Sequence, residues 1–208
     1  MRKYFMTYMA VIALPLSAGA IEQDISKLPS GTYEVDKTHA SITWKVSHLG
    51  LSYYTARFTD FDATIDLNTE NLAKSSVNVS INPASVKTDY PHPEKKDFDK
   101  KLATGKDWFN AEKFPTATFK STNVVKITDT TGKITGDLTF LGTSQPVELD
   151  VTFNGGMEEH PYAKKPALGF SAHTTLKRSE WGFNTYVPNI GDEVEVLIEA
   201  EFVKKDGE

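Results

Sequence analysis

The sequence predicts an all-β protein of about eight antiparallel strands, arranged as an up-and-down barrel or a sandwich. Apolar and polar residues alternate in about eight short segments, and a period of two is typical of half-buried strands. Turn-forming residues separate these segments, which favours antiparallel neighbours. Only residues 89–114, a charged stretch bounded by prolines, break the pattern. We therefore expect one helical excursion between strands.

The first 20 residues predict a secretory signal peptide that is cleaved after Ala20. They carry an early positive charge from Arg2 and Lys3, then an apolar stretch, and they end in the small-residue pattern A-x-A. An uncleaved anchor is the alternative, but the apolar run is too short and too proline-broken to favour a spanning helix. Residues 21–208 are then expected to form one domain, exported to the periplasm.

Charge and cysteine content exclude several classes of function. Without the first 20 residues, Lys and Arg fall from 23 to 21 while Asp and Glu stay at 28, so the net charge is near −7. This balance argues against nucleic acid or anionic lipid headgroups as main partners, but not against an uncharged lipid. The chain has no cysteine, which excludes disulfides, thiolate metal sites, thiol catalysis and a lipoprotein anchor.

The opening strand of the predicted sheet is residues 41–50. Ile42, Trp44 and Val46 share one face of it, and His48 continues that face at its end. A polar leader at residues 21–30, a short strand at 32–36 and a turn at 36–39 are expected before it. The later alternating segments are residues 61–67, 77–81, 116–122, 134–140, 147–153, 168–176 and 194–202. Residues 154–156 read as a turn.

The excursion at residues 89–114 predicts a short helix over residues 94–102. Phe98 and Leu102 are four residues apart and therefore lie on one side of such a helix. A long excursion between strands is often functional or a lid, but its apolar side can equally pack on the outside of the barrel. Both interpretations remain open at this point.

No catalytic or metal-binding motif stands out. Residues 169–173 superficially resemble a nucleophile elbow, but they lack its final glycine and lie inside a strand pattern. None of the five histidines stands at metal-ligand spacing from another: His39, His48, His92, His160 and His173. We therefore expect neither a catalytic set nor a bound metal.

Several short motifs, in order along the chain, resemble the YceI family of exported lipocalin-like proteins. They lie at residues 35–41, 46–50, 58–63, 85–88, 108–110, 114–121, 136–142, 178–182 and 190–194. The resemblance implies an extended eight-stranded antiparallel barrel around a long apolar channel. It also implies a polyisoprenoid or another long-chain amphiphile, such as a polyprenyl phosphate or quinone, as ligand. No catalytic residue set and no cofactor define the family.

Ten residues are candidates for contact with such a ligand. They are apolar residues of the inward strand faces together with two polar groups near strand ends: Ile42, Trp44, Val46, His48, Phe58, Phe61, Phe119, Phe140, Phe170 and Arg178. Periodicity cannot separate a filled core from a lined channel, because both use the same residue types. His48 can bond a polar ligand head or a backbone carbonyl, and Arg178 can face an anionic head or solvent.

The leading hypothesis is a periplasmic protein that binds, and carries or stores, a long-chain isoprenoid. An enzyme acting on a lipid or quinone, and a ligand-free stress or interaction protein with a filled barrel, are the alternatives. We expect no nucleic-acid partner and no stable membrane insertion. Open strand edges and the family resemblance make a homodimer conceivable.

Overall fold

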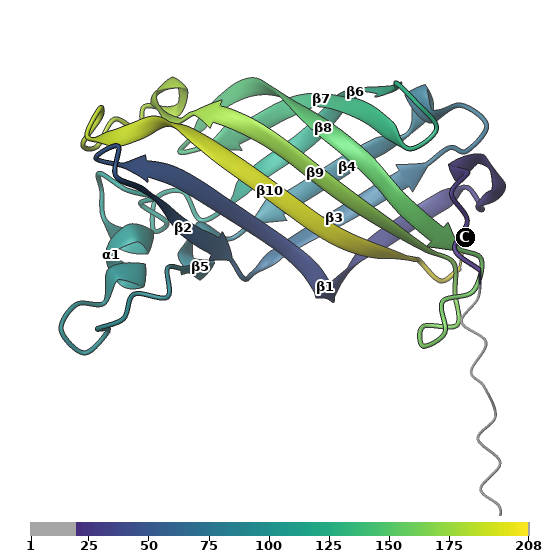
Figure 1. Cartoon of the computed structure of the whole chain (residues 1–208), viewed down its shortest axis with the longest axis horizontal. Coiled ribbons are helices and arrows are strands. Elements are labelled where there is room, and N and C mark those ends of the chain that lie inside the picture. The colour runs from purple at the N-terminus through teal and green to yellow at the C-terminus, as the bar shows by residue number, and fades with distance from the viewer. Residues whose placement is uncertain (1–19, 208) are drawn as a thin grey trace, which may run out of the picture.

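Eight antiparallel strands close into an elongated barrel in the computed structural model, which describes residues 20–207 (Figure 1). Each strand pairs with the next around the barrel, and the last pairs back with the first. In this order they are β1 (Gly31–His48), β3 (Phe61–Leu67), β4 (Ser76–Ile81), β6 (Ala117–Lys126), β7 (Thr131–Phe140), β8 (Thr143–Met157), β9 (Ala167–Lys177) and β10 (Ile190–Lys204). The predicted eight-stranded antiparallel barrel is confirmed. The predicted signal peptide lies, apart from Ala20, outside the described residues.

Strand β1 is one continuous strand of 18 residues, so the predicted turn at residues 36–39 is wrong. Its pairing with β10 jumps from Val35 opposite Phe202 to Ala40 opposite Ala200, which leaves a bulge of extra residues on β1. The Asp36 carboxylate accepts hydrogen bonds from the backbone N–H of Thr38 (2.9 Å) and from its hydroxyl (2.6 Å). A local side-chain bond thus supports the bulge while the strand continues beyond it.

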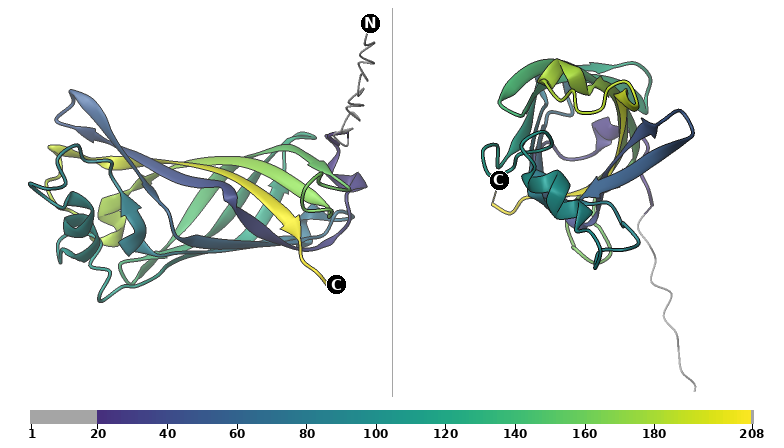
Figure 2. Two further views of the ribbon diagram at one scale, coloured as in Figure 1. Left: turned by 90° about the horizontal axis from the view of Figure 1, so that it is seen from below. Right: turned by 90° about the vertical axis from the view of Figure 1, so that its left-hand side faces the viewer.

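The barrel wall divides at one end. The first residues of β1 pair with β3, whereas Ile42 to His48 pair with β2 (Ser52–Phe58), and the short β5 (Val86–Lys87) pairs with β2. The β1–β2 hairpin therefore projects from the barrel, and helix α1 (Phe98–Thr104) lies at the same end (Figures 1 and 2).

Helix α1 begins four residues later than predicted. The Asp97 side chain accepts a hydrogen bond from the Lys100 N–H (2.9 Å), and this N-cap fixes the start. Leu102 and Ala103 are buried against β5 and the segment that follows the helix. The excursion thus packs across the end of the barrel rather than on its outer wall.

The leader at residues 21–30, expected only as a polar segment before the first strand, closes the opposite end of the barrel. It contains a 3-10 turn (Ile25–Lys27), and Ile25 and Leu28 are buried in the core. Glu22 and Gly156 exchange two backbone hydrogen bonds of 2.8 and 2.9 Å. A Cβ on Gly156 would lie 2.3 Å from the Leu28 side chain, so the glycine permits this docking. Strand β8 accordingly runs through the turn predicted at residues 154–156.

Three further 3-10 turns connect the strands: Leu72–Lys74, Pro83–Ser85 and Arg178–Trp181. The segment predicted at residues 116–122 extends to Lys126 as strand β6, with a register shift between Ser121 and Asn123.

Candidate functional site: an apolar channel through the barrel

The barrel interior is lined rather than filled. Inward-facing residues such as Val79, Phe170 and Ile198 remain only half-buried although the wall closes around them. They border two cavities of about 170 and 210 Å³. We call these the leader-end cavity and the helix-end cavity.

The two cavities meet in the middle of the barrel. Four residues line both of them, and we call these four the waist: Ile42, Val79, Leu149 and Ile198. The two cavities therefore lie end to end along the barrel with the waist between them, and we call the two together the channel.

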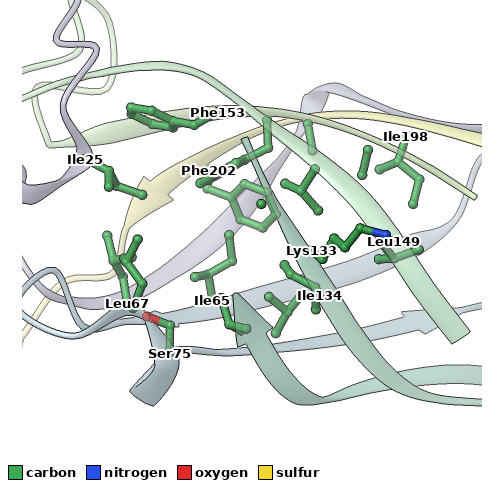
Figure 3. Close-up of a pocket in the computed structure, with 18 of the residues that line it drawn as sticks. Ile25, Ile65, Leu67, Ser75, Lys133, Ile134, Leu149, Phe153, Ile198 and Phe202 are labelled. Carbon is green, nitrogen blue, oxygen red and sulfur yellow. The ribbon is translucent and has the colours of Figure 1, made fainter. Parts of the chain in front are cut away.

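The leader-end cavity has mainly aliphatic walls, together with four phenylalanines (Figure 3). Ile65, Leu67 and Phe202 lie around it, and Ile25 of the leader contributes from one side. Its polar lining is confined largely to the β6–β7 turn, and consists of Ser75 and of residues 126, 128–131 and 133. A long apolar chain can thus lie inside while a polar group stays near this turn.

The helix-end cavity is aromatic. Phe109, from the segment after α1, is at its centre and contacts the rings of Trp44, Phe58, Phe140 and Phe183 at centroid distances of 5.6 to 6.3 Å. Such edge and tilted contacts stabilise each pair beyond simple area burial. Two neighbouring elements, the excursion and the loop before β10, thus complete the end of the channel.

One polar donor of this cavity has no partner. Trp181 donates its Nε1–H to the Leu138 carbonyl (3.0 Å). The Nε1 atom of Trp44 is buried but makes no hydrogen bond in the part of the chain that the structure describes, and the same holds for the Tyr54 hydroxyl. Buried donors are normally paired, so the Trp44 indole offers an unused hydrogen bond beside the cavity.

Arg178 lies at the end of the helix-end cavity, and it is 6% exposed rather than open to solvent. Its guanidinium donates to four backbone carbonyls at 2.8 to 3.0 Å: Phe183, Thr185, Ile190 and Gly191. Burial lowers the pKa of this group, and the nearby Asp192 carboxylate partly offsets that effect. Its hydrogen-bonding capacity is therefore largely used in fixing the loop before β10.

Asp192 is held in the same network. Burial alone would raise its pKa, but hydrogen bonds from Ser179 and the charges of Arg178 and Lys177 outweigh burial and bring the pKa below its usual value. The Ser179 hydroxyl donates to this carboxylate at 2.7 Å. The end of the channel therefore carries a fixed, internally compensated pair of charges.

Nine of the ten predicted contact residues line the channel. Ile42 is at the waist, Phe61 and Phe170 border the leader-end cavity, and the other six border the helix-end cavity: Trp44, Val46, Phe58, Phe119, Phe140 and Arg178. His48 lines neither cavity and is exposed at the end of β1. Ligand contact by any of them remains a prediction.

Sequence reasoning missed the aromatic residues that come from loops. Trp108, Phe109 and Phe183 line the helix-end cavity but lie outside any alternating strand pattern. The only available signal was the unusual density of aromatic residues in otherwise polar connections.

A second polar cluster lies on the outer wall. A carboxylate oxygen of Asp36, a ring nitrogen of His39 and a carboxylate oxygen of Glu201 all lie within 4.8 Å of one another, because the β1 bulge faces β10. The His39 bond, with help from Thr38, lowers the Asp36 pKa to about 2, and the same pairing raises the pKa of His39. The hydrogen bonds within the cluster already occupy Asp36, and it lies outside the channel.

Among the described residues, no helix is long and apolar enough to cross a membrane.

The comparisons with known proteins agree with this architecture. Residues 33–202 match the family model described as a YceI-like domain. Protein YceI of Escherichia coli is 37% identical over 175 residues, which cover 83% of this chain and 87% of that protein.

Two solved structures share the fold. The YCEI protein of Campylobacter jejuni has a TM-score of 0.66 and 32% identity, over 78% of this chain and 91% of that one. A polyisoprenoid binding domain from Saccharophagus degradans has a TM-score of 0.57 and 11% identity, over 85% of this chain and all of that one. The family match, the relative and the barrel with its channel together show that this chain belongs to the YceI family.

Proposed function

We propose that this protein is an exported, periplasmic carrier or store for a long-chain isoprenoid or a similar amphiphile. A polyprenyl phosphate or a polyprenyl quinone is the expected ligand class. Residues 1–20 serve as the cleaved signal peptide, and residues 21–208 form the lipid-binding domain. The proposal includes ligand contact by the channel residues named above.

The observation that carries the proposal is the pair of apolar cavities that meet at the waist. A protein with a filled barrel would bury its inward residues fully, whereas here the waist residues border open space on both sides. Burial of apolar surface contributes about 25 cal/mol per Å² before the cost of ordering the ligand, so a long hydrocarbon chain suits this interior.

The similarity to a polyisoprenoid binding domain from Saccharophagus degradans supports the same ligand class. The channel walls favour a binding protein over an enzyme acting on a lipid, since Arg178 is bonded to backbone and His48 lies outside. Turnover of a polyprenyl substrate that is lost in His48→Ala would instead favour the enzyme.

The test is native mass spectrometry of the mature protein, purified without detergent from its natural host, followed by lipid extraction. A discrete added mass that matches a polyprenyl or long-chain amphiphile is the expected result. A bare protein mass, together with no uptake of added isoprenoids, would overturn the proposal and favour an interaction protein. The same spectra report whether the protein is a monomer or a homodimer.

A further inference from the structure

Five of the ten exposed large apolar side chains among the described residues lie close together at the end of the barrel that carries α1. Leu49, Leu51 and Tyr53 of the β1–β2 hairpin are 55, 85 and 62% exposed, and Tyr186 and Val187 of the loop before β10 are 61 and 37% exposed. We call these five residues the apolar tip. The Leu49 N–H donates to the Asn189 carbonyl at 2.7 Å, which ties hairpin and loop together.

The turn of the β1–β2 hairpin places a strained leucine with a water-exposed side chain at the surface. Leu49 has a φ of 57° and Gly50 a φ of 69°, as in the tight hairpin turns that favour asparagine and glycine. A leucine in the left-handed region is strained, and its exposed side chain gains no burial in return. Leu51 follows it with an even larger exposed fraction. An apolar environment around the tip would account for both residues.

The apolar tip is continuous with the channel. Tyr186 contacts the ring of Trp108 at 6.0 Å, and Trp108 contacts Phe183 at 5.9 Å. Trp108 and Phe183 line the helix-end cavity. The Thr185 hydroxyl also donates to the Asp107 carbonyl, which joins this loop to the segment after α1. A path of aromatic residues thus leads from the exposed surface to the interior.

Charge at this end differs from the rest of the chain. Residues 94–107, which contain α1, carry five lysines and four acidic residues, so this segment has a net charge near +1. All five lysines are exposed, and Asp97 and Asp99 are engaged as the helix cap and as acceptor for Thr88. Salt screening limits surface electrostatics to roughly 8 Å, so the exposed lysines of this nearly neutral end act independently of the net charge near −7 of residues 21–208.

We propose that the α1 end of the barrel docks on the surface of a phospholipid bilayer that carries anionic headgroups. This inference rests on the proposed function, since the bilayer is where an isoprenoid would enter or leave the channel. The apolar tip inserts among the lipids, and the lysines around α1 bind headgroups, as in other peripheral proteins that combine apolar and basic contacts. Docking is reversible and places the aromatic path against the lipid.

The test is flotation with vesicles of phosphatidylethanolamine and phosphatidylglycerol in a three-to-one ratio. We expect the mature protein to float, and the double variant Leu49→Ser/Leu51→Ser to bind at least tenfold more weakly, because two leucine side chains no longer insert. The matched control is Ile127→Ser/Tyr162→Ser, which removes two exposed apolar residues from the β6–β7 and β8–β9 connections at the opposite end, neither of which lines a cavity. Lys100→Glu/Lys106→Glu should also weaken binding, and more so at low salt.

Uptake of a radiolabelled polyprenol separates docking from ligand binding. The tip variant should take up the polyprenol normally from detergent micelles but more slowly from vesicles. Normal uptake from micelles with no flotation, or equal flotation of tip and control variants, would overturn the docking proposal alone. A tip that instead holds two copies of the chain together, shown by a dimer that dissociates in the tip variant without a change in flotation, would also overturn it. No uptake from micelles by the unmodified protein would overturn the proposed function.

Discussion

Blocking the waist should divide the channel into two separate cavities. Val79, on β4, lines both cavities and is only half-buried, so the side chain of Val79→Trp can extend into the channel. Overpacking in a filled core lowers the free energy of unfolding by about 1–3 kcal/mol. Because the cavities leave room for the indole, we expect a loss at the low end of this range. The control is Leu197→Trp, on the outer face of β10, where the leucine is 46% exposed.

The length of the channel sets the expected effect. Its regularly alternating inward β10 residues extend from Val194 to Phe202, and Ile190 also lines the channel beyond a shift in pairing register. At about 3.3 Å per residue and a tilt of about 40°, this corresponds to roughly 20 Å along the barrel. An extended five-carbon isoprenoid unit is about 5 Å long, so about four units fill the channel. At about 0.3 kcal/mol per non-hydrogen atom, each unit contributes about 1.5 kcal/mol, or about tenfold in affinity.

The assay is competition by prenols of increasing length against a fluorescent fatty ligand. In the unmodified protein and in Leu197→Trp, affinity should rise about tenfold per unit and level off near four units. In Val79→Trp it should level off near two units, which leaves a four-unit prenol about 100-fold weaker while short prenols bind as before. The same length dependence in both tryptophan variants, with both folded by thermal melting, would refute the idea of one continuous channel.

Three further predictions concern the ends and the wall. Arg178→Lys should destabilise the protein by about 2–4 kcal/mol in urea, because one ammonium cannot satisfy four carbonyls; unchanged stability would contradict this role. Gly156→Ala should lower the free energy of unfolding by about 1–3 kcal/mol. Gly169→Ala should lower it less, because a Cβ at Gly169 would lie no closer than 3.6 Å to any neighbouring atom. The lowered pKa of Asp36 stabilises the folded protein above the unfolded pKa of about 3.8, and this stabilisation is lost as the pH falls toward 2. The raised pKa of His39 stabilises the folded protein below about pH 6.5, and this stabilisation is lost as the pH rises through the raised pKa. The melting temperatures of the unmodified protein and Asp36→Asn should therefore differ most between about pH 4 and 6.5, and a pH-independent difference would argue against the pair.

The strand walls could be predicted from sequence because alternation is a local property. Ile42, Trp44 and Val46 share a face whatever the rest of the chain does, and that face proved to line the channel. His48 continues the same spacing but lies outside, since β1 by then runs beyond the channel into the projecting hairpin. Periodicity gives the side of a strand on which a residue lies, but not where along the strand the interior ends.

Features that depend on pairing between distant segments could not be predicted. The leader appeared polar, yet Leu28 is buried because Gly156, far away in sequence, leaves room for it. Arg178 was expected to face an anionic head or solvent, yet two carbonyls of a later loop and two at the start of β10 surround it. Whether the interior was filled or open was equally undetermined, because the same aromatic and aliphatic residues serve either purpose.

Chain length should outweigh headgroup chemistry in the choice of ligand. A hydrogen bond from the unpaired Nε1–H of Trp44 to a ligand oxygen near the helix end would contribute about 1 kcal/mol to the binding free energy, or roughly fivefold in affinity. Two additional isoprenoid units in the channel are worth about 3 kcal/mol, or roughly 100-fold. Arg178 adds little to headgroup selection, since its donors are already bonded to backbone. A channel of this kind therefore selects first for an apolar chain long enough to cross the waist, and only then for the polar group at its end.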